Sequence, residues 1–195
     1  MLNRIKEKLG EPLNRSARLL HRVGFTPTTT TLLGLLCAVV SGAGYYTSKY
    51  YSEMIYVALI FLILSGFFDA VDGAIARLFS GATRFGGVLD SVSDRIEEII
   101  ILIGIVAGGL ASGPIGLFAL AGSLMVSYAR ARVESEGGNM SGVGLAERPE
   151  RLIVLACATA VQFVDIGVLV MAAISWVTVA QRMLSAYRQL SGTKN

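Results

Sequence analysis

The 195-residue sequence is poor in histidine, cysteine and charge. His21 is the single histidine, so a metal site built on several imidazoles is excluded, and its place in the basic N-terminal segment argues against a Ser-His-Asp triad. The two cysteines, Cys37 and Cys157, fall within apolar stretches, so a disulfide framework is not indicated. Charged residues make up 16% of the chain and hydrophobic residues 53%, a balance that ordinary soluble domains do not have. The composition therefore favours an integral membrane protein.

Charge is absent from several long stretches of the chain. The longest uncharged runs are residues 23–48, 54–68, 99–129, 152–164 and 166–181. A Gly-Pro pair within residues 111–114 interrupts the third run near its middle, which makes that run a hairpin of two spans. The runs therefore predict six transmembrane helices. A soluble helical bundle with short buried helices is the alternative.

Positive charge lies almost entirely on one side of the predicted membrane. With six crossings, the segments 1–25, 77–95, 130–151 and 182–195 share one side and carry 16 of the 17 Lys and Arg residues, whereas Lys49 lies opposite. By the positive-inside rule, the first side is cytoplasmic, and both termini lie there. The predicted location is the cell membrane, and no nucleic acid partner is expected. The first span is expected to act as an uncleaved anchor.

The chain divides into a short surface segment, one membrane domain and a tail. Residues 1–25 alternate apolar and basic side chains, which predicts one or two amphipathic helices on the cytoplasmic membrane surface, with a break near Gly10 and Pro12. The six-helix domain is expected to cover residues 26–190. Residues 191–195 are left as a C-terminal tail.

Four aspartates gather at the cytoplasmic ends of the second and third predicted spans. Asp69 and Asp72 are three residues apart and Asp90 and Asp94 four apart, so each pair shares one helix face. A loop over residues 81–87 makes the two spans antiparallel neighbours, and Asp90 opens the third span. Carboxylates that converge without a cation repel one another, and hard divalent cations prefer oxygen ligands. The cluster predicts a divalent metal site, with the ion pathway of a metal-ion transporter as the alternative.

The stretch that carries these aspartates reads D-x2-D-G-x2-A-R-x8-G-x3-D-x3-D. Its specified residues are Asp69, Asp72, Gly73, Ala76, Arg77, Gly86, Asp90 and Asp94. With no departure, this pattern resembles the signature of the membrane CDP-alcohol phosphotransferases. The resemblance implies an all-α integral membrane protein in which six transmembrane helices surround a polar cavity that faces the cytoplasm. The aspartate-rich motif of soluble prenyl synthases is a rival with a different spacing.

The resemblance also implies a role for each matching residue. A pair of divalent cations, Mg²⁺ or Mn²⁺, is expected on Asp69, Asp72, Asp90 and Asp94, with Asp94 also the general base. The expected CDP-binding residues are Thr31, Asp72, Gly73, Ala76, Arg77 and Gly86. Paired metals neutralise a diphosphate and stabilise the attacking and leaving oxygens together. The implied donor is a CDP-lipid, either CDP-archaeol or CDP-diacylglycerol.

The acceptor is inferred from residues outside the motif. The segments SYARARVE (127–134), ERPERL (147–152) and QRM (181–183) resemble the branch of the family that uses inositol phosphate. Carried over by position, the phosphate-binding residues are Ser127, Arg130, Arg151 and Arg182, with Arg132 and Arg148 as supporting charges. Arginine suits bidentate phosphate recognition, but arginines that only flank membrane spans are the alternative. Within the family, glycerol phosphate, serine and free inositol are the other acceptors.

Together these residues give the hypothesis of a membrane transferase of phospholipid synthesis. Asp94 would deprotonate a hydroxyl of inositol phosphate, which attacks the lipid-linked phosphorus of the CDP-lipid and releases CMP. A direct displacement needs no covalent enzyme intermediate, and no Ser, Cys or His is arranged to form one. Membrane lipids surround the domain, and because family members are commonly dimers, a homodimer is one expected assembly.

Overall fold

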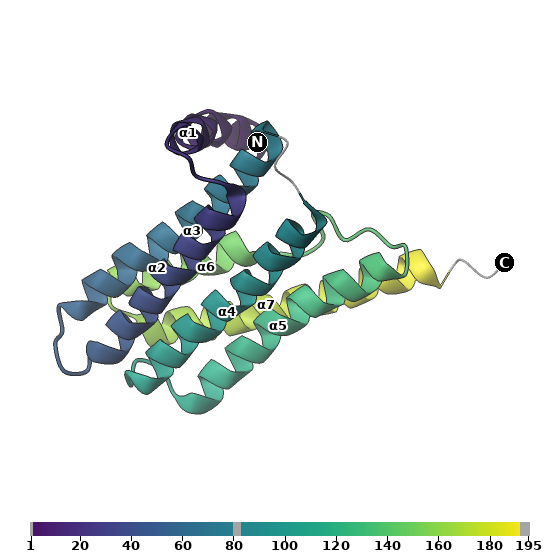
Figure 1. Ribbon diagram of the computed structural model, residues 1–195. Coiled ribbons are helices and arrows are strands. Elements are labelled where there is room, and N and C mark those ends of the chain that lie inside the picture. The colour runs from purple at the N-terminus through teal and green to yellow at the C-terminus, as the bar shows by residue number, and fades with distance from the viewer. Residues whose placement is uncertain (1, 80–82, 192–195) are drawn as a thin grey trace.

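The computed structural model describes residues 2–79 and 83–191, with side chains from residue 10 onward. Within these ranges the chain forms seven α-helices and no strand (Figure 1). The helices are α1 Leu2–Arg22, α2 Pro27–Thr47, α3 Met54–Leu78, α4 Arg84–Ala107, α5 Gly113–Ser135, α6 Arg148–Ala160 and α7 Val164–Leu190. The predicted all-α class is confirmed.

A reciprocal cap fixes the start of α2. The Thr29 backbone N–H donates to the Thr26 hydroxyl at 3.2 Å, and the Thr26 N–H donates to the Thr29 hydroxyl at 2.8 Å. This capping box satisfies two backbone donors that would otherwise be free. Pro27 follows at the first helical position, where its fixed φ suits a helix. The start of α2 is therefore dictated locally by the sequence.

Two glycines allow α2 to pack closely against α3 and α4. A Cβ atom at Gly42 would lie 2.8 Å from the Ile100 carbonyl oxygen of α4, and one at Gly44 would lie 2.9 Å from the Ala58 nitrogen of α3. Neither position has room for a side chain. α2 packs against both helices, and α3 and α4 meet each other through side chains, as in the hydrogen bond from Ser65 of α3 to Glu97 of α4. They converge where α3 carries Asp69 and Asp72 and α4 carries Asp90.

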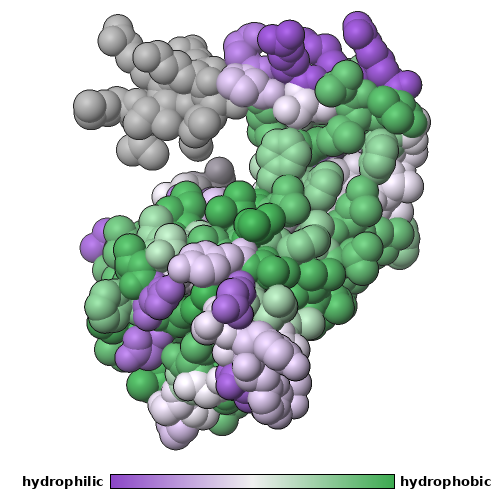
Figure 2. Space-filling view, turned by 90° about the vertical axis from the view of Figure 1, so that its left-hand side faces the viewer, coloured by the Kyte–Doolittle hydropathy of each residue, from purple (hydrophilic) through white to green (hydrophobic). Residues whose placement is uncertain are grey.

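The outer surface of the bundle is largely apolar. Among the described residues, α2, α3, α5 and α7 are long and apolar enough to cross a membrane. The first half of α4 is charged, and α6 has 13 residues, fewer than the roughly 20 that a bilayer core requires. Large apolar side chains such as Leu36, Ile63 and Leu117 are exposed, and Figure 2 shows broad hydrophobic areas on one face. These are the features of a multi-pass membrane protein.

The N-terminal segment is one continuous helix, so the predicted break near Gly10 and Pro12 is wrong. Pro12 lies inside α1, which runs across the end of α3 (Figure 1). Proline removes one backbone hydrogen bond from the helix. The helix continues because Ala17, which is fully buried, packs against Val71 and Ile75 of α3 and anchors the turns that follow the proline.

The start of α4 also differs from the predicted loop over residues 81–87. The Thr83 hydroxyl caps the helix by accepting a hydrogen bond of 2.9 Å from the Gly86 N–H, so α4 begins at Arg84. The cap outweighs the low helix propensity of Gly86 and Gly87. Asp90 therefore lies in the second turn of α4 and does not open the helix. Residues 81 and 82 of the predicted loop lie outside the described residues.

The hairpin predicted for residues 99–129 is confirmed. α4 ends at Ala107 and α5 begins at Gly113, so the long uncharged run divides where the Gly-Pro pair predicts. α6 and α7 are joined at residues 161–163, just before Asp165. Of the predicted C-terminal tail, residues 192–195 lie outside the described residues.

Candidate active site

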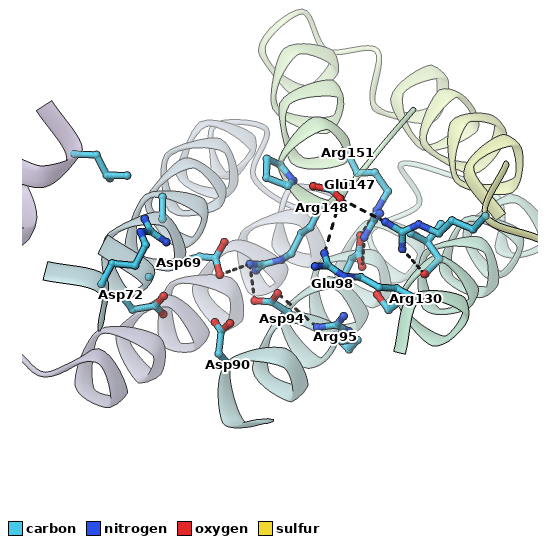
Figure 3. A pocket seen from close by; sticks show the side chains of 18 residues that line it. Asp69, Asp72, Asp90, Asp94, Arg95, Glu98, Arg130, Glu147, Arg148 and Arg151 are labelled. Carbon is cyan, nitrogen blue, oxygen red and sulfur yellow. Dashed lines mark hydrogen bonds and ion pairs between the residues drawn. The ribbon is translucent and has the colours of Figure 1, made fainter. Parts of the chain in front are cut away.

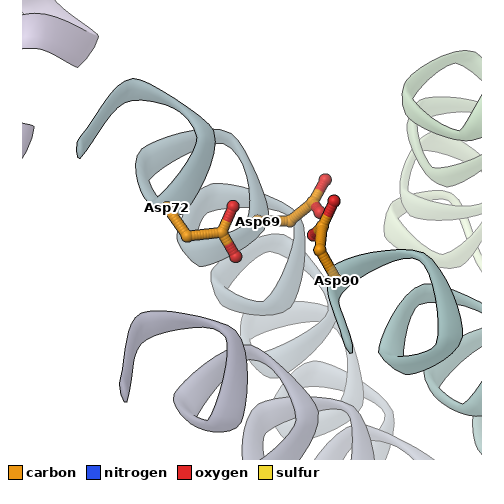
Figure 4. Close-up of side chains that lie close together, drawn as sticks. All are labelled: Asp69, Asp72 and Asp90. Carbon is orange, nitrogen blue, oxygen red and sulfur yellow. The ribbon is translucent and has the colours of Figure 1, made fainter. Parts of the chain in front are cut away.

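Three of the four predicted aspartates converge at one end of the bundle. Asp69 and Asp72 come from neighbouring turns of α3, and Asp90 comes from α4 (Figure 4). One carboxylate oxygen of each lies within 4.8 Å of the others. Asp72 is 5% exposed and accepts a hydrogen bond of 2.9 Å from the Thr31 hydroxyl of α2. The helical spacing of the motif thus places these carboxylates together, as predicted.

This aspartate cluster has the chemistry of a divalent cation site. All three groups are hard oxygen donors, the ligands that Mg²⁺ and Mn²⁺ prefer. The Oδ1 atom of Asp90 is buried and has no hydrogen-bond partner among the described residues, an uncommon condition for a buried carboxylate. A cation bound by the cluster would satisfy this oxygen and offset the repulsion between the carboxylates. The residues present therefore fit a divalent cation.

Asp94 lies one helical turn beyond Asp90 and outside the group of three converging carboxylates. Its Oδ1 atom is 2.7 Å from Nη1 of Arg148, and its Oδ2 atom is 3.6 Å from Nη1 of Arg95. Figure 3 shows the Asp94 side chain between Asp90 and Arg148. Asp94 therefore stands between the aspartate cluster and the start of α6. Its roles as a metal ligand and as the base stay predictions.

Carboxylates surround Arg148 at the start of α6. Its Nη1 atom lies 2.8 Å from Asp69 and 2.7 Å from Asp94 (Figure 3), and its Nη2 atom pairs with Glu97. Burial by itself lowers the pKa of the Arg148 guanidinium, but the surrounding carboxylates outweigh burial and raise the pKa above its ordinary value. Arg148 thus stays charged and lies among the aspartates, on the metal side of the cavity.

One cavity of about 700 Å³ contains both halves of the predicted site. Its lining includes all four aspartates of the motif and all four predicted acceptor residues, namely Ser127, Arg130, Arg151 and Arg182. Helices α3 to α7 all contribute to it. Arg132 is not among its lining residues, because the side chain is exposed and pairs with Glu136. Carboxylates and arginines that are far apart in sequence therefore face the same space.

Protein groups fix the orientation of two buried arginines in this cavity. Arg151 donates to Glu98 through Nε at 2.7 Å and through Nη2 at 3.1 Å. Arg182 donates through Nη1 to the Val126 carbonyl at 2.6 Å and through Nε to the Val143 carbonyl at 2.9 Å. Both side chains are 2% exposed. Their charges are therefore held in place before any ligand binds.

Arg130 and Glu147 border the same part of the cavity. Arg130 pairs with Glu134 at 3.0 Å, and its Nη1 atom lies 3.8 Å from Glu147. The Glu147 carboxylate is also 3.5 Å from Nη2 of Arg182. A carboxylate thus stands between two of the predicted phosphate-binding arginines. The pocket is basic, but two glutamates partly balance its charge.

A smaller cavity of about 140 Å³ lies beside the aspartate cluster, between the start of α2 and the facing turns of α3 and α4. Its lining includes five of the predicted CDP-binding residues, Thr31, Asp72, Gly73, Ala76 and Gly86. Arg77 lines the large cavity, and a Cβ atom at Gly73 would lie 3.1 Å from its Nη1 atom, so the glycine leaves room for this arginine. Asp72, Gly73 and Asp90 line both cavities, which therefore meet at the aspartate cluster.

The sequence interpretation missed two buried glutamates, Glu97 and Glu98, which bind Arg148 and Arg151. A signal for them was present. Asp90, Asp94, Glu97 and Glu98 are spaced at i, i+4, i+7 and i+8, the pattern of a single helix face. Four acidic residues on one face of a predicted membrane helix indicate a polar interior. The motif ends at Asp94 and therefore does not include the two glutamates.

The chain is similar to known proteins over nearly its whole length. The CDP-alcohol phosphatidyltransferase family matches residues 25–187. The archaetidylinositol phosphate synthase of Pyrococcus horikoshii is 39% identical over 190 residues, which cover 97% of this chain and 98% of that protein. The crystal structure of Mycobacterium tuberculosis phosphatidylinositol phosphate synthase with CDP-DAG bound has a TM-score of 0.79 at 29% identity and covers 94% of this chain and 97% of its own. The structure of the same enzyme in complex with manganese and citrate has a TM-score of 0.78 at 28% identity, and the match covers 94% of this chain and 92% of that one.

The family match and the site agree with each other. The matched region contains the whole aspartate motif and the cavity residues on α5, α6 and α7. A metal-dependent transferase requires the carboxylate cluster that α3 and α4 build. From the match over most of its length and from these residues, the chain belongs to the CDP-alcohol phosphatidyltransferase family and is an enzyme of phospholipid synthesis.

Proposed function

We propose that this enzyme transfers the phosphatidyl or archaetidyl group of a CDP-lipid onto inositol phosphate and releases CMP. One observation carries the proposal: a single cavity holds the aspartate cluster at one part and Arg130, Arg151 and Arg182 at another. A transfer between a diphosphate donor and a phosphorylated acceptor requires both kinds of site within reach of each other. The names of the similar synthases, and the CDP-DAG bound to one of them, support the same reaction.

The aspartate cluster would hold the divalent cations of the reaction. Asp69, Asp72 and Asp90 are the ligands that the geometry favours, and Asp94 would complete the set. Two cations, Mg²⁺ or Mn²⁺, would neutralise the diphosphate of the donor and stabilise the charge that develops on CMP as it leaves. Manganese in a similar synthase supports a divalent metal of this type.

The nucleotide would lie in the smaller cavity and reach the cluster where the two cavities meet. Thr31, Gly73, Ala76 and Gly86 line this space with small side chains, so a flat base and a ribose can approach the helices closely. Arg77 lines the large cavity beside them and would pair with a phosphate oxygen. Asp72 belongs to both the cluster and the nucleotide side. The lipid part of the donor, archaeol or diacylglycerol, would extend into the membrane.

Asp94 would act as the general base. It faces the large cavity between the cluster and the arginines, where an acceptor hydroxyl would have to lie. An Asp94 carboxylate oxygen accepts the proton of that hydroxyl as the new oxygen–phosphorus bond forms. The bond between this phosphorus and the oxygen of CMP breaks, and CMP leaves with the electron pair. Arg148, which contacts Asp94, orients the carboxylate and stabilises its charged form before the transfer.

The acceptor phosphate would bind to Arg130, Arg151 and Arg182, with Ser127 beside them. The backbone carbonyls of Val126 and Val143 hold Arg182, and Glu98 holds Arg151, so neither guanidinium has to be ordered when the phosphate binds. Arg130 is the more exposed of the three and is the one that can move to the ligand. Bidentate guanidinium groups give this pocket a preference for a phosphate dianion over an uncharged alcohol.

The membrane arrangement of the enzyme is proposed to include six spans. In addition to the four long apolar helices, α4 and α6 would cross with their charged ends at the cytoplasmic side. The distribution of Lys and Arg supports a cytoplasmic position for the termini, the cavity and the surface helix α1. Soluble inositol phosphate then reaches the site from the cytoplasm, and a homodimer is the proposed assembly.

Radiolabelled inositol phosphate tests the proposed reaction in membranes that contain the enzyme. With CDP-diacylglycerol or CDP-archaeol present, label is expected to move into the lipid fraction only when a divalent cation is added. Glycerol phosphate, serine and free inositol, each labelled in a parallel reaction, are expected to give little product. Transfer to one of these three, with none to inositol phosphate, would contradict the proposal.

A further inference from the structure

Two buried ion pairs join α4 to the start of α6. Glu97 pairs with Arg148, and the next residue, Glu98, pairs with Arg151 at 2.7 Å (Figure 3 shows the second pair). Glu97 is 2% exposed and Glu98 is 4% exposed. Carboxylates are rarely buried to this extent, and a buried ion pair contributes little net stability. The steps of the proposed reaction assign no part to Glu97, and they use Glu98 only as the partner of Arg151.

Groups from α2 and α3 hold Glu97 in place. The Ser65 hydroxyl donates a hydrogen bond of 2.6 Å to Oε2 of Glu97, the oxygen that Arg148 also contacts. On the other side, a Cβ atom at Gly34 would lie 3.1 Å from Oε1, so α2 packs directly against the carboxylate. Glu97 has no space to turn away, and its negative charge is fixed beside Arg148.

The two pairs direct their arginines to different parts of the cavity. Arg148 reaches the metal side, where it contacts Asp69 at 2.8 Å and Asp94 at 2.7 Å. Arg151 belongs to the acceptor side with Arg182. Building on the proposed function, we propose that Glu97 and Glu98 are positioning residues with separate tasks. Glu97 acts through Arg148 on the affinity of the aspartate cluster for divalent cations, and Glu98 acts through Arg151 on the affinity for the acceptor phosphate.

Glu97 sets the charge balance around Arg148. Arg148 is a single positive charge shared by Asp69, Asp94 and Glu97. Its Nη1 atom lies 2.8 Å from Asp69 and 2.7 Å from Asp94, so its charge acts directly on both aspartates. Without the charge of Glu97, the guanidinium pairs with the aspartates alone and competes with a cation for Asp69. The loss of the Glu97 charge also weakens cation binding directly, so the two effects add.

Glu98 fixes the orientation of Arg151. Both of its carboxylate oxygens accept hydrogen bonds from Arg151, and Nη1 of Arg151 donates to the Ala146 carbonyl at 3.3 Å. This bidentate contact fixes the plane of the guanidinium. Glu98 has no hydrogen bond or ion pair with an aspartate within the described part of the chain. A change at Glu98 therefore acts mainly on the acceptor side, with a smaller effect of its charge on Arg148.

The adjacent substitutions Glu97→Gln and Glu98→Gln test this division of tasks, and each serves as the control for the other. Mn²⁺ binding to the purified full chain is measured by electron paramagnetic resonance without substrates. Glu97→Gln is expected to weaken Mn²⁺ binding roughly ten-fold, and Glu98→Gln to change it by less than about two-fold. At saturating Mn²⁺, Glu98→Gln is expected to raise the KM for inositol phosphate roughly ten-fold, and Glu97→Gln by less than about three-fold.

A double substitution tests whether Glu97 acts through Arg148. Arg148→Gln is expected to tighten Mn²⁺ binding, and adding Glu97→Gln to it should then change the affinity by less than about three-fold. Because the double variant removes both charges of the pair, it carries the test if Glu97→Gln alone does not fold. The proposal would be overturned if Glu97→Gln and Glu98→Gln changed the Mn²⁺ affinity equally and the KM for inositol phosphate equally. It would also be overturned if Glu97→Gln weakened Mn²⁺ binding as much in the Arg148→Gln background as in the wild type. Mn²⁺ binding is measured without an acceptor. If the enzyme proved to use a different acceptor, the proposed function would be contradicted, but the effect of Glu97 on Mn²⁺ binding would still stand.

Discussion

The Thr31 hydroxyl of α2 donates a hydrogen bond of 2.9 Å to Oδ2 of Asp72 on α3, although the two residues are 41 positions apart in sequence. The Pro27 carbonyl oxygen, 3.0 Å from the same hydroxyl, is its alternative acceptor. Asp72 belongs to the aspartate cluster and lines both cavities. Thr31 therefore couples the start of α2 to the point where the two cavities meet at the aspartate cluster.

Thr31→Val tests this coupling with almost no change of shape. Asp72 would lose the hydroxyl that fixes its orientation, so the KM for the CDP-lipid is expected to rise several-fold and stability to fall by about 1 kcal/mol. Thr47→Val is the matched control, because the Thr47 hydroxyl bonds only within α2, to the Ala43 and Gly44 carbonyls at the far end of the helix. Steady-state kinetics and thermal unfolding in detergent measure the two effects. An unchanged KM for Thr31→Val would show that this bond does not organise the donor site.

Asp90→Asn is expected to abolish metal binding and activity together. The substitution removes one of three converging carboxylates, the one with an unpartnered buried oxygen. Because the cations neutralise the diphosphate, transfer should fall by about 1,000-fold or more. Mn²⁺ titration and a transfer assay provide the two measurements. Asp165→Asn, an exposed carboxylate at the start of α7, is the control and should leave both at wild-type values.

Asp94→Asn separates the base from the metal ligands. If Asp94 removes the proton from the acceptor, transfer should fall by about 100-fold to 10,000-fold, while Mn²⁺ still binds to the other three aspartates. The rate is to be measured at saturating metal and saturating substrates, so that weaker binding does not contribute. A variant that transfers at the full rate would remove the base assignment. Loss of Mn²⁺ binding equal to that of Asp90→Asn would instead make Asp94 chiefly a ligand.

Arg182→Gln is expected to affect both the acceptor and the fold. The guanidinium bonds the carbonyls of Val126 and Val143, so its loss leaves buried acceptors without a partner and lowers stability by about 1 to 3 kcal/mol. The KM for inositol phosphate should rise about ten-fold or more, with a smaller change for the CDP-lipid. Arg188→Gln, an exposed arginine two turns later on α7, is the matched control. Equal increases of both KM values would point to a purely structural role.

The part of the site that the sequence predicted well depends on local geometry. Asp69 and Asp72 share a face of α3 because they are three residues apart. Asp90 and Asp94 share a face of α4 because they are four residues apart. The Gly-Pro pair likewise divides the long uncharged run at the right place. Such features need only the neighbouring residues, so a single sequence contains them.

The parts that were missed depend on packing between distant segments. Arg148 contacts Asp69 and Asp94 only because α6 packs beside α3. This packing cannot be read from the position of Arg148 in the sequence. A contact between α3 and α4 likewise buries Glu97 against Ser65. The continuity of α1 through Pro12 also comes from tertiary contacts, since a proline taken alone argues for a break.

The central claim is that one cavity joins a metal-bound CDP-lipid to an acceptor phosphate held by arginines. Its most direct test is the mass spectrum of the lipid formed by the purified enzyme from CDP-diacylglycerol or CDP-archaeol, inositol phosphate and Mn²⁺, together with the amount of CMP released. A phosphoinositol phosphate lipid in a one-to-one ratio with CMP is the predicted result. CMP release with no lipid of that mass, or a lipid product only when another acceptor is supplied, would contradict the account.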